Sequence, residues 1–312
     1  MTEIKTNEKI AFHPISVDDK AIYEEYLCAD KNNRGCEFSF ANLCLWGRQS
    51  LARMGDNILL FSQFNRRSVY PYPVGKGDKR EVLDAIIADA AARGIPCRIT
   101  GLDVLAKETV DTLYPGKFRF HCDEGSFDYV YGIDDLAELS GKKYHGKRNH
   151  LNRFKEEHPN YTVEPITEGN IPVVKEMLKE WYRVRLEENP RADYHMEAAA
   201  IQKALSYYKE LALDGLVLFD GNEPLAFTMG SFLRGDTFDV HFEKARVDVG
   251  IAYTAINYEF ARYIRERYPQ IHFLDREEDM GLEGLRKAKK SYHPHHMIEK
   301  CWGCLLEDGY DY

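Results

Sequence analysis

The fold of this chain is decided by one stretch, Arg246-Val-Asp-Val-Gly250-Ile-Ala252-Tyr-Thr-Ala-Ile-Asn257-Tyr-Glu-Phe-Ala-Arg-Tyr-Ile-Arg265. In the preceding residues 237–244, apolar side chains alternate with polar ones, which predicts a strand. After Gly250 the apolar side chains recur at helical spacing, which predicts a long helix. The start of such a helix presents unpaired N–H groups and the positive end of the helix dipole, so it favours an anion. We therefore expect a ligand at this turn; the alternative is that Gly250 serves only a tight turn.

The flanking segments extend this unit into a domain. Helices are predicted over 171–187, 196–211 and 284–292, a hairpin over 216–232, and strands over 271–275 and 297–306. The sequence Asp220-Gly221-Asn222 is typical of the hairpin turn. The first half alternates helices with short strands, as an α/β layer does. Two domains are predicted, 1–158 and 159–312, each a mixed sheet flanked by helices, with a basic helix over 142–155 at their junction.

Composition and charge narrow the class of protein. The chain has 312 residues, of which 44% are hydrophobic and 30% charged, so it can form sizeable cores in two domains. A net charge of −9 argues against indiscriminate binding to nucleic acid or anionic membranes, although it leaves room for a local basic patch. The sequence has neither an apolar run of membrane-spanning length nor the apolar core of a signal peptide at its start. We therefore expect a cytoplasmic protein without a transmembrane helix, of undefined oligomeric state.

Cysteine usage also favours a cytoplasmic protein. Seven cysteines, an odd number in a long chain, do not indicate a disulfide framework, which favours a reducing compartment. The run Cys301-Trp-Gly-Cys304 has the spacing of a redox pair or of half a zinc site. On a strand, however, the two side chains point to opposite faces, so we interpret them as core cysteines. The sequence thus predicts no metal site.

A basic segment covers residues 141–155, with six lysines or arginines, two histidines and no acid. Two interpretations remain open. The segment is either a solvated linker helix or a site for the phosphates of a nucleotide or of RNA. In the second case the predicted contacting residues are Lys143, Lys147 and Arg148.

Ionisable side chains gather after two of the predicted strands. Acyl transfer needs a base that deprotonates an amine or hydroxyl nucleophile, and Glu243, at the end of strand 237–244, is placed for that role. Tyr292 is the second predicted catalytic residue. The alternative is that Glu243 is an ordinary exposed or ion-paired acid.

A substrate site is predicted beside these residues. Arg286 and Lys289 are three residues apart, so they share a helix face. An arginine clamps a carboxylate and Asp279 would hold an ammonium, so this pair suits a zwitterionic amino acid. The complete predicted substrate-binding set is Asp279, Arg286, Lys289, Gly250, Ala252 and Asn257. The alternative is a surface ion-pair cluster.

Four segments carry a family resemblance. They are Cys36-Glu-Phe-Ser-Phe-Ala-Asn-Leu, Tyr144-His-Gly-Lys-Arg-Asn, Phe242-Glu-Lys-Ala and residues 278–294. The chain resembles a bacterial family related to the C-terminal domain of phosphatidylglycerol lysyltransferase, whose members carry two tandem domains of the GNAT acyltransferase fold. The resemblance implies the same fold here. Lys147-Arg-Asn149 is also similar to the basic segment of Fem-type aminoacyl transferases, which take an amino acid from aminoacyl-tRNA.

The GNAT motif for acetyl-CoA, Gln/Arg-x-x-Gly-x-Gly/Ala, is matched only in part. Gly250 and Ala252 agree with it, but Val247 stands at its first position. Asp248 places an acid where the pyrophosphate would lie. Because like charges repel, we expect weak or no binding of acetyl-CoA.

The sequence therefore predicts an acyl or aminoacyl transferase that acts on an amine or hydroxyl acceptor. Its donor would be acyl-CoA or aminoacyl-tRNA, its substrate a small molecule or amino acid, and tRNA a candidate partner. One alternative is a conventional acyl-CoA-dependent N-acyltransferase. A second is a catalytically silent module that binds a small ligand. Turnover of a donor separates the silent module from the two enzymes.

Overall fold

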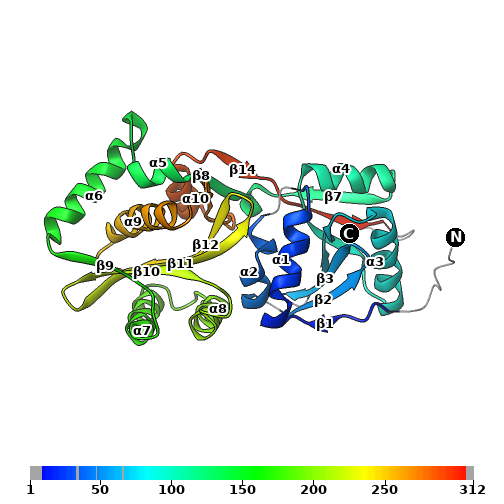
Figure 1. The fold of residues 1–312 in the computed structure, drawn as a ribbon, viewed down its shortest axis with the longest axis horizontal. Coiled ribbons are helices and arrows are strands. Elements are labelled where there is room, and N and C mark those ends of the chain that lie inside the picture. The colour runs from blue at the N-terminus through cyan, green and yellow to red at the C-terminus, as the bar shows by residue number, and fades with distance from the viewer. Residues whose placement is uncertain (1–8, 33–34, 47, 65–66, 307–312) are drawn as a thin grey trace. The chain divides into compact units, whose positions relative to one another are not determined.

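A computed structural model describes residues 9–306 except 33–34, 47 and 65–66. The chain forms two compact units (Figure 1). The first comprises Met1–Asp128, Glu278–Leu282 and Met297–Tyr312, and the second Tyr129–Glu277 and Glu283–His296. This division differs from the predicted boundary at residue 158. The reason is that the strand after Asp128 and the basic helix pack into the second unit, whereas the last strand returns to the first.

The first unit is built on a mixed sheet in the order β1-β2-β3-β4-β6-β15-β7, with β5 paired to β3. Its strands are β1 (His13–Pro14), β2 (Arg48–Met54), β3 (Asn57–Phe64), β4 (Arg67–Pro71), β5 (Val74–Gly75), β6 (Arg98–Leu102), β7 (Phe118–Cys122) and β15 (Cys301–Leu305). Its α-helices are α1 (Lys20–Ala29), α2 (Phe40–Leu45), α3 (Lys79–Arg93) and α4 (Val104–Leu113). The short 3-10 helices are η1 (Val17–Asp19), η2 (Cys36–Phe38) and η3 (Glu124–Ser126). Strands β4 and β6 are parallel, so the sheet is mixed as predicted.

The second unit has a mixed sheet in the order β14-β8-β13-β12-β11-β10-β9. Its strands are β8 (Asp128–Gly132), β9 (Tyr161–Pro165), β10 (Asp214–Asp220), β11 (Glu223–Arg234), β12 (Thr237–Ala245), β13 (Phe273–Asp275) and β14 (His296–Ile298). Its helices are α5 (Ile133–Glu138), η4 (Lys142–Tyr144), α6 (His145–Glu157), α7 (Ile171–Glu188), α8 (His195–Ser206), α9 (Ala252–Arg267) and α10 (Glu283–Lys290). In Figure 1, α7 and α8 lie on one face of this sheet and α9 on the other. Within the described part of the chain, no helix is long and apolar enough to cross a membrane.

Local sequence explains where several elements begin and end. The carboxylate of Asp78 accepts a hydrogen bond from the backbone N–H of Arg80 and caps α3, and Gly94 ends that helix in the left-handed conformation. Gly221 lies in the tight turn between β10 and β11, which confirms the predicted hairpin. The predicted last strand 297–306 is instead two strands in different sheets.

An irregularity in β12 shapes the second unit. The register between β11 and β12 shifts between Met229 and Gly230, whose partners are Phe242 and Val240. His241 is therefore the extra residue of a β-bulge. A bulge bends the strand and reverses the alternation of side chains beyond it. The bulge lies inside the stretch that the sequence predicts as a regular strand, because a period-2 pattern does not indicate an inserted residue.

Two contacts show the effect of the bulge. Phe238, before it, contacts a phenylalanine of α9, and Glu243, after it, is hydrogen-bonded to an asparagine of the same helix. In a regular strand, positions of opposite parity would face opposite sides of the sheet. The parallel pairing of β12 with β13 ends in register at Asp239 and Asp275. Beyond these two positions β12 still pairs with β11 but no longer with β13, and side chains from this region form the site described below.

The disulfide between Cys122 and Cys301 corrects the prediction of two core cysteines on the last strand. The two residues are direct partners in the antiparallel pair of β7 and β15. They are 179 residues apart in the sequence, so no local spacing could indicate the pair. Cys304 is buried and outside any disulfide, as predicted for a core cysteine. The disulfide removes the support that cysteine usage lent to a reducing compartment.

Candidate active site

Glu243 and Arg276 form an ion pair where β12 and β13 separate. Arg276 Nη2 lies 2.8 Å from Glu243 Oε1, and the two side chains are only 14% and 12% exposed. Burial opposes the charge of Arg276, but the Glu243 carboxylate raises the pKa of this guanidinium, so it stays charged. Glu243 is therefore an ion-paired acid in this structure, as the alternative interpretation states. Its role as a base stays a prediction.

Two polar atoms beside this pair have no hydrogen-bond partner among the described residues. They are Arg276 Nη1 and Asn257 Oδ1, and both are buried. The side-chain nitrogen of Asn257 lies 3.4 Å from Glu243 Oε2, so both residues contact one carboxylate. Buried polar atoms are normally hydrogen-bonded, so a leftover donor and a leftover acceptor at one place indicate a position for a ligand.

Lys147 of α6 and the buried Tyr292 complete this cluster. Lys147 Nζ lies 3.6 Å from the centroid of the Tyr292 ring, and the guanidinium carbon of Arg276 lies 5.0 Å from it. Burial and repulsion by Arg276 lower the pKa of Lys147 to about 8, against the attraction of Glu243. Burial raises the pKa of Tyr292. Lys147 can therefore exchange a proton near neutral pH, whereas Tyr292 stays a neutral phenol whose oxygen lies 3.5 Å from Thr254 Oγ1.

The other predicted substrate-binding residues lie in different surroundings. Lys289 of α10 donates hydrogen bonds to the backbone carbonyl oxygens of Arg276 and Glu277, so it holds the turn after β13. Arg286 is half-buried on the same helix. Asp279 is fully buried, belongs to the first unit, and accepts a hydrogen bond from a backbone N–H two residues further on. The joint role of Asp279 and Arg286 in binding an amino acid stays a prediction.

A cavity of about 390 Å³ opens at the N-terminal end of α9. Its lining consists of His150, Arg153, Glu157, His158 and the turn 248–251. A Cβ atom on Gly250 would meet nothing within 4 Å, so the turn itself does not require a glycine. Ala252 is buried at the first position of the helix. The cavity thus brings the predicted ligand turn together with Arg153 of the basic segment, which is ion-paired with Glu157 in the same lining.

Two acidic side chains also border this cavity, Glu157 and Asp248. Asp248 lines it and lies 2.7 Å from Arg246, whose hydrogen bonds lower the pKa of the Asp248 carboxyl. The carboxylate therefore keeps its negative charge beside the turn. Its position supports the expectation that a pyrophosphate is disfavoured there.

The three residues predicted to contact phosphates differ in their contacts. Lys143 Nζ lies 3.0 Å from a carboxylate oxygen of Asp135. Arg148 donates hydrogen bonds to the backbone carbonyl oxygens of Leu139 and Gly141. Lys147 instead joins the cluster around Tyr292. Binding of phosphate or RNA by this set stays a prediction.

Sequence reasoning did not place Arg276 in the site, nor did it place Lys147 beside Tyr292. A signal for Arg276 was available, because it directly follows the strand whose end had been assigned to the site. No such signal existed for Lys147, because six basic side chains of the segment 141–155 look alike in the sequence. Only the packing of α6 against α9 distinguishes it.

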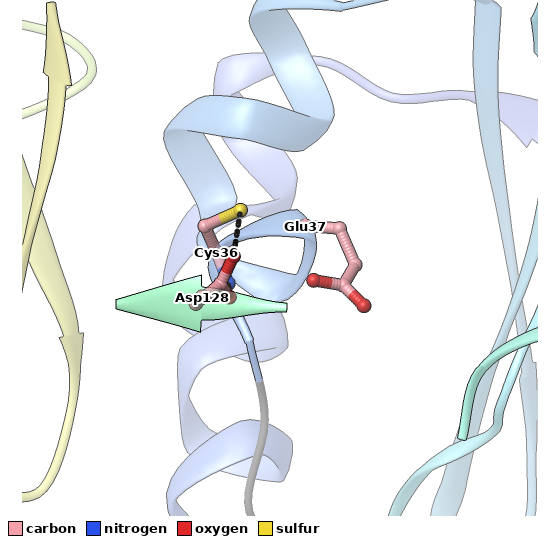
Figure 2. A group of neighbouring side chains, drawn as sticks. All are labelled: Cys36, Glu37 and Asp128. Carbon is pink, nitrogen blue, oxygen red and sulfur yellow. Dashed lines mark hydrogen bonds between the residues drawn. The ribbon is translucent and has the colours of Figure 1, made fainter. Parts of the chain in front are cut away.

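The first unit holds a second cluster of ionisable side chains, drawn in part in Figure 2. Lys300 Nζ lies 2.7 Å from Asp128, 3.2 Å from Glu37 and 3.4 Å from Glu278, measured to carboxylate oxygens, and 3.5 Å from Cys36 Sγ. Figure 2 shows the Cys36 thiol directed at Asp128, to which it donates a hydrogen bond of 3.4 Å.

Burial and charge together set the ionisation of this cluster. Burial opposes the charge of Lys300, but the carboxylates around it, Asp128 foremost, raise the pKa of the ammonium well above its usual range. Burial raises the pKa of Asp128 to about 7, against the attraction of Lys300, and the carboxylates of Glu37 and Glu278 add to the rise. An ammonium therefore fills the place among these acidic groups that a metal ion would need. We interpret the cluster as a buried ion-pair network.

Several known proteins are similar to this chain in sequence or in structure. The chain spans 56% of the length of an uncharacterised Mycoplasmoides gallisepticum protein, to which it is 24% identical over 179 residues. A Bacteroides thetaiotaomicron protein of unknown function is 35% identical, with a TM-score of 0.89, over 95% of this chain and 100% of that one. The lysylphosphatidylglycerol synthase structure from Bacillus licheniformis is 17% identical, with a TM-score of 0.64, over 92% of each chain.

More distant structures define the fold class. The structure of FemX covers 96% of this chain and 98% of its own, with a TM-score of 0.59 at 12% identity. A tandem GNAT protein from clavulanic acid biosynthesis covers 97% and 100%, with a TM-score of 0.52 at 10% identity. The predicted tandem GNAT-like fold is confirmed. The family model described as phosphatidylglycerol lysyltransferase, C-terminal, matches residues 29–304. The chain therefore belongs to the family of the phosphatidylglycerol lysyltransferase C-terminal domain.

Proposed function

We propose that this chain transfers an aminoacyl group of the lysyl class from an activated ester, such as an aminoacyl-tRNA, to an amine or hydroxyl acceptor. Family membership and fold support a transferase of this class. The observation that carries the proposal is the cluster of Glu243, Arg276, Tyr292 and Lys147, with a buried donor and a buried acceptor that no described residue satisfies. An aminoacyl-tRNA donor would place the reaction in the cytoplasm.

The chemistry of the transfer assigns a role to each group. The acceptor must lose a proton as it attacks the ester carbonyl, and Lys147, with a pKa of about 8, is matched to take that proton. The carbonyl oxygen becomes negative in the tetrahedral intermediate, and Arg276 Nη1, which has no partner among the described residues, would stabilise it. The intermediate then collapses with cleavage of the ester C–O bond, and the protonated Lys147 would return its proton to the departing oxygen of the donor. Asn257 Oδ1 would accept a hydrogen bond from the ammonium of the aminoacyl group.

The sequence predicts Glu243 as the base, whereas we propose a different division of roles. Glu243 is hydrogen-bonded to Arg276 and Asn257. We propose that it orients these two side chains toward the substrate. Tyr292 carries the ring on which Lys147 packs, so we propose that it positions the base.

The cavity at the start of α9 is proposed to hold an anionic part of the donor. Arg153 lines it, and the helix dipole adds to the attraction of this guanidinium for a phosphate. Lys143 and Arg148, on the helix of Arg153 and the turn before it, would carry the predicted basic contacts to tRNA, whereas Lys147 serves as the base. Asp248 stays anionic beside the turn, so a single phosphodiester of tRNA is favoured there over the doubly charged pyrophosphate of acyl-CoA.

A donor screen tests the proposed function directly. The protein is incubated with lysyl-tRNA, with a lysyl ester of the tRNA 3′ end, or with acetyl-CoA, and consumption of the ester or thioester is followed with amine and hydroxyl acceptors. We expect turnover of the lysyl esters and none of acetyl-CoA. Turnover of acetyl-CoA alone would instead support an acyl-CoA-dependent N-acyltransferase. Ligand binding without turnover of any donor would support the silent binding module.

Lys147→Ala is expected to lower the transfer rate by about 10²–10⁴-fold, the usual contribution of a general base. In the wild-type protein the neutral amine is the active form, so the rate should rise with pH through about 8. Lys147→Arg keeps the positive charge but cannot lose it, so the rise should disappear. A Lys147→Arg variant with the rate and pH profile of the wild-type protein would contradict the assignment.

Arg286 is proposed to bind the carboxylate of an amino-acid substrate. Arg286→Ala should abolish the rise in thermal midpoint that free lysine causes in the wild-type protein, because loss of one partner of a partly buried, hydrogen-bonded charge costs about 2–5 kcal/mol of binding. The matched control is Lys287→Ala, an exposed residue of the same helix, which should leave the rise intact. Equal behaviour of the two variants would remove Arg286 from the site.

A further inference from the structure

His241, in the second unit, has polar side-chain atoms of other residues close to both of its ring nitrogens. His241 Nε2 lies 2.8 Å from Ser231 Oγ. On the other side of the ring, His241 Nδ1 lies 3.3 Å from Asp239 Oδ2 and 3.4 Å from Glu277 Oε1. The side chains of Asp239 and His241 are fully buried, and that of Glu277 is 20% exposed. None of these residues has a place in the transfer reaction proposed above.

The fold explains how these side chains meet. His241 follows Asp239 by two residues on β12, so the two side chains face the same side of the strand. Asp239 is paired with Asp275 at the end of β13, and Glu277 follows two residues later. Glu277 adopts a left-handed backbone conformation, and its N–H donates a hydrogen bond to the Asp275 carboxylate. Asp239 on β12 and Glu277 in the turn after β13 thus place two carboxylates beside one imidazole nitrogen.

The distances separate two chemical interpretations. A serine, a histidine and an aspartate in this order resemble a nucleophilic triad, but in such a triad Nδ1–H donates to a carboxylate, and charge-assisted bonds of this kind are about 2.7–2.9 Å long. Here both carboxylate oxygens stand further away, at 3.3 and 3.4 Å. Ser231 is also only 5% exposed, which is unfavourable for a nucleophile.

The same distances fit the edges of a tetrahedron around a metal ion. Zinc bonds of about 2.0–2.1 Å to nitrogen and about 2.0–2.2 Å to oxygen place neighbouring ligand atoms about 3.3–3.5 Å apart. The three candidate ligand atoms lie within 4.8 Å of one another. The contact to Ser231 supplies the outer partner that metal-binding histidines normally have, because Nε2–H donating to Ser231 Oγ leaves the Nδ1 lone pair for the metal.

We propose that Asp239, His241 and Glu277 form a binding site for one divalent metal ion of the zinc class. A neutral imidazole and two carboxylates suit Zn²⁺, whereas Mg²⁺ prefers oxygen ligands only. The site lies two residues before Glu243 on the same strand, so a bound ion would fix the end of β12 from which the active-site carboxylate projects. The proposal is independent of the transfer reaction and adds a metal site that the sequence analysis did not predict.

The experiment measures metal directly on the whole chain. The protein is stripped with a chelator, dialysed against Zn²⁺ or Mg²⁺, and its metal content and thermal midpoint are determined. We expect one Zn²⁺ per chain with a raised midpoint, and no Mg²⁺ at the same concentration. Replacement by Co²⁺ should give the visible absorption of a tetrahedral site without a thiolate-to-metal band, because no cysteine belongs to the set.

Variants locate the ion. His241→Ala and Glu277→Gln should lose the stoichiometric zinc, and Ser231→Ala, which keeps all three ligands, should bind it about 10–100-fold more weakly. Cys36→Ser, in the first-unit cluster of Figure 2, should bind it like the wild-type protein. Glu277 is partly exposed, so its variant remains informative if His241→Ala fails to fold. The proposal is overturned by absence of stoichiometric zinc, by a thiolate band with Co²⁺, or by zinc retained in Glu277→Gln.

Discussion

Replacing Arg276 by methionine is expected to destabilise the second unit by about 3–5 kcal/mol, because Glu243 is left as a buried carboxylate without its cation. The effect is large because both side chains are mostly removed from water, at 14% and 12% exposure. Transfer activity should be lost as well, since the proposed donor to the developing oxyanion disappears. The measurement is amide hydrogen exchange in β12 and α9, which reports the stability of the second unit separately from that of the first.

Two further variants make this expectation specific. Arg276→Met combined with Glu243→Gln removes both charges, so it should recover much of the lost stability but none of the activity. Arg246 is the matched control, because this arginine of the same unit pairs with the exposed Glu223 and Asp248. Arg246→Ala should cost less than about 1 kcal/mol, as surface ion pairs do. A loss as small for Arg276→Met as for Arg246→Ala would show that the Glu243 pair is not desolvated.

Lys300→Met is expected to destabilise the first unit by a comparable amount, about 3–5 kcal/mol near pH 8, since Asp128 is completely buried and loses its nearest cation. The exposed pair of Lys179 with Glu176 provides the control, because Lys179→Ala should change stability by less than about 1 kcal/mol. Amide hydrogen exchange in β6 and β15 measures the stability of the first unit. A loss no larger than that of Lys179→Ala would contradict the interpretation of the cluster as a buried network.

The sign of the pH dependence gives a second readout for this variant. The pKa of Asp128 is raised to about 7 in the folded protein, so the folded state holds this proton more tightly than the unfolded chain. Its contribution therefore makes folding more favourable as the pH falls from about 7 toward the ordinary range of a carboxyl group. Without Lys300 the pKa of Asp128 should rise further. The cost of Lys300→Met should thus shrink when the pH is lowered from 8 to 5, whereas the cost of an exposed-pair variant should not.

The sequence by itself determined the element types of the second unit and its fold class. Alternation over 237–244, helical spacing after Gly250 and the Asp220-Gly221-Asn222 turn are local signals, and each reports the backbone of its own neighbours. The same local patterns predicted Glu243 at the end of a strand and Asn257 on the following helix. Those two residues, with Tyr292, do lie in or beside one cluster.

The tertiary structure decided what those side chains contact. Whether Glu243 faces Arg276, and which lysine of the basic segment loses part of its hydration, depends on a bulge and on helix packing that no local pattern encodes. Cys122 and Cys301 likewise become neighbours only because β15 returns to the first sheet. The ionisation of Lys147 and the geometry around His241 follow from burial and from contacts between distant segments, and these exist only once the chain has folded.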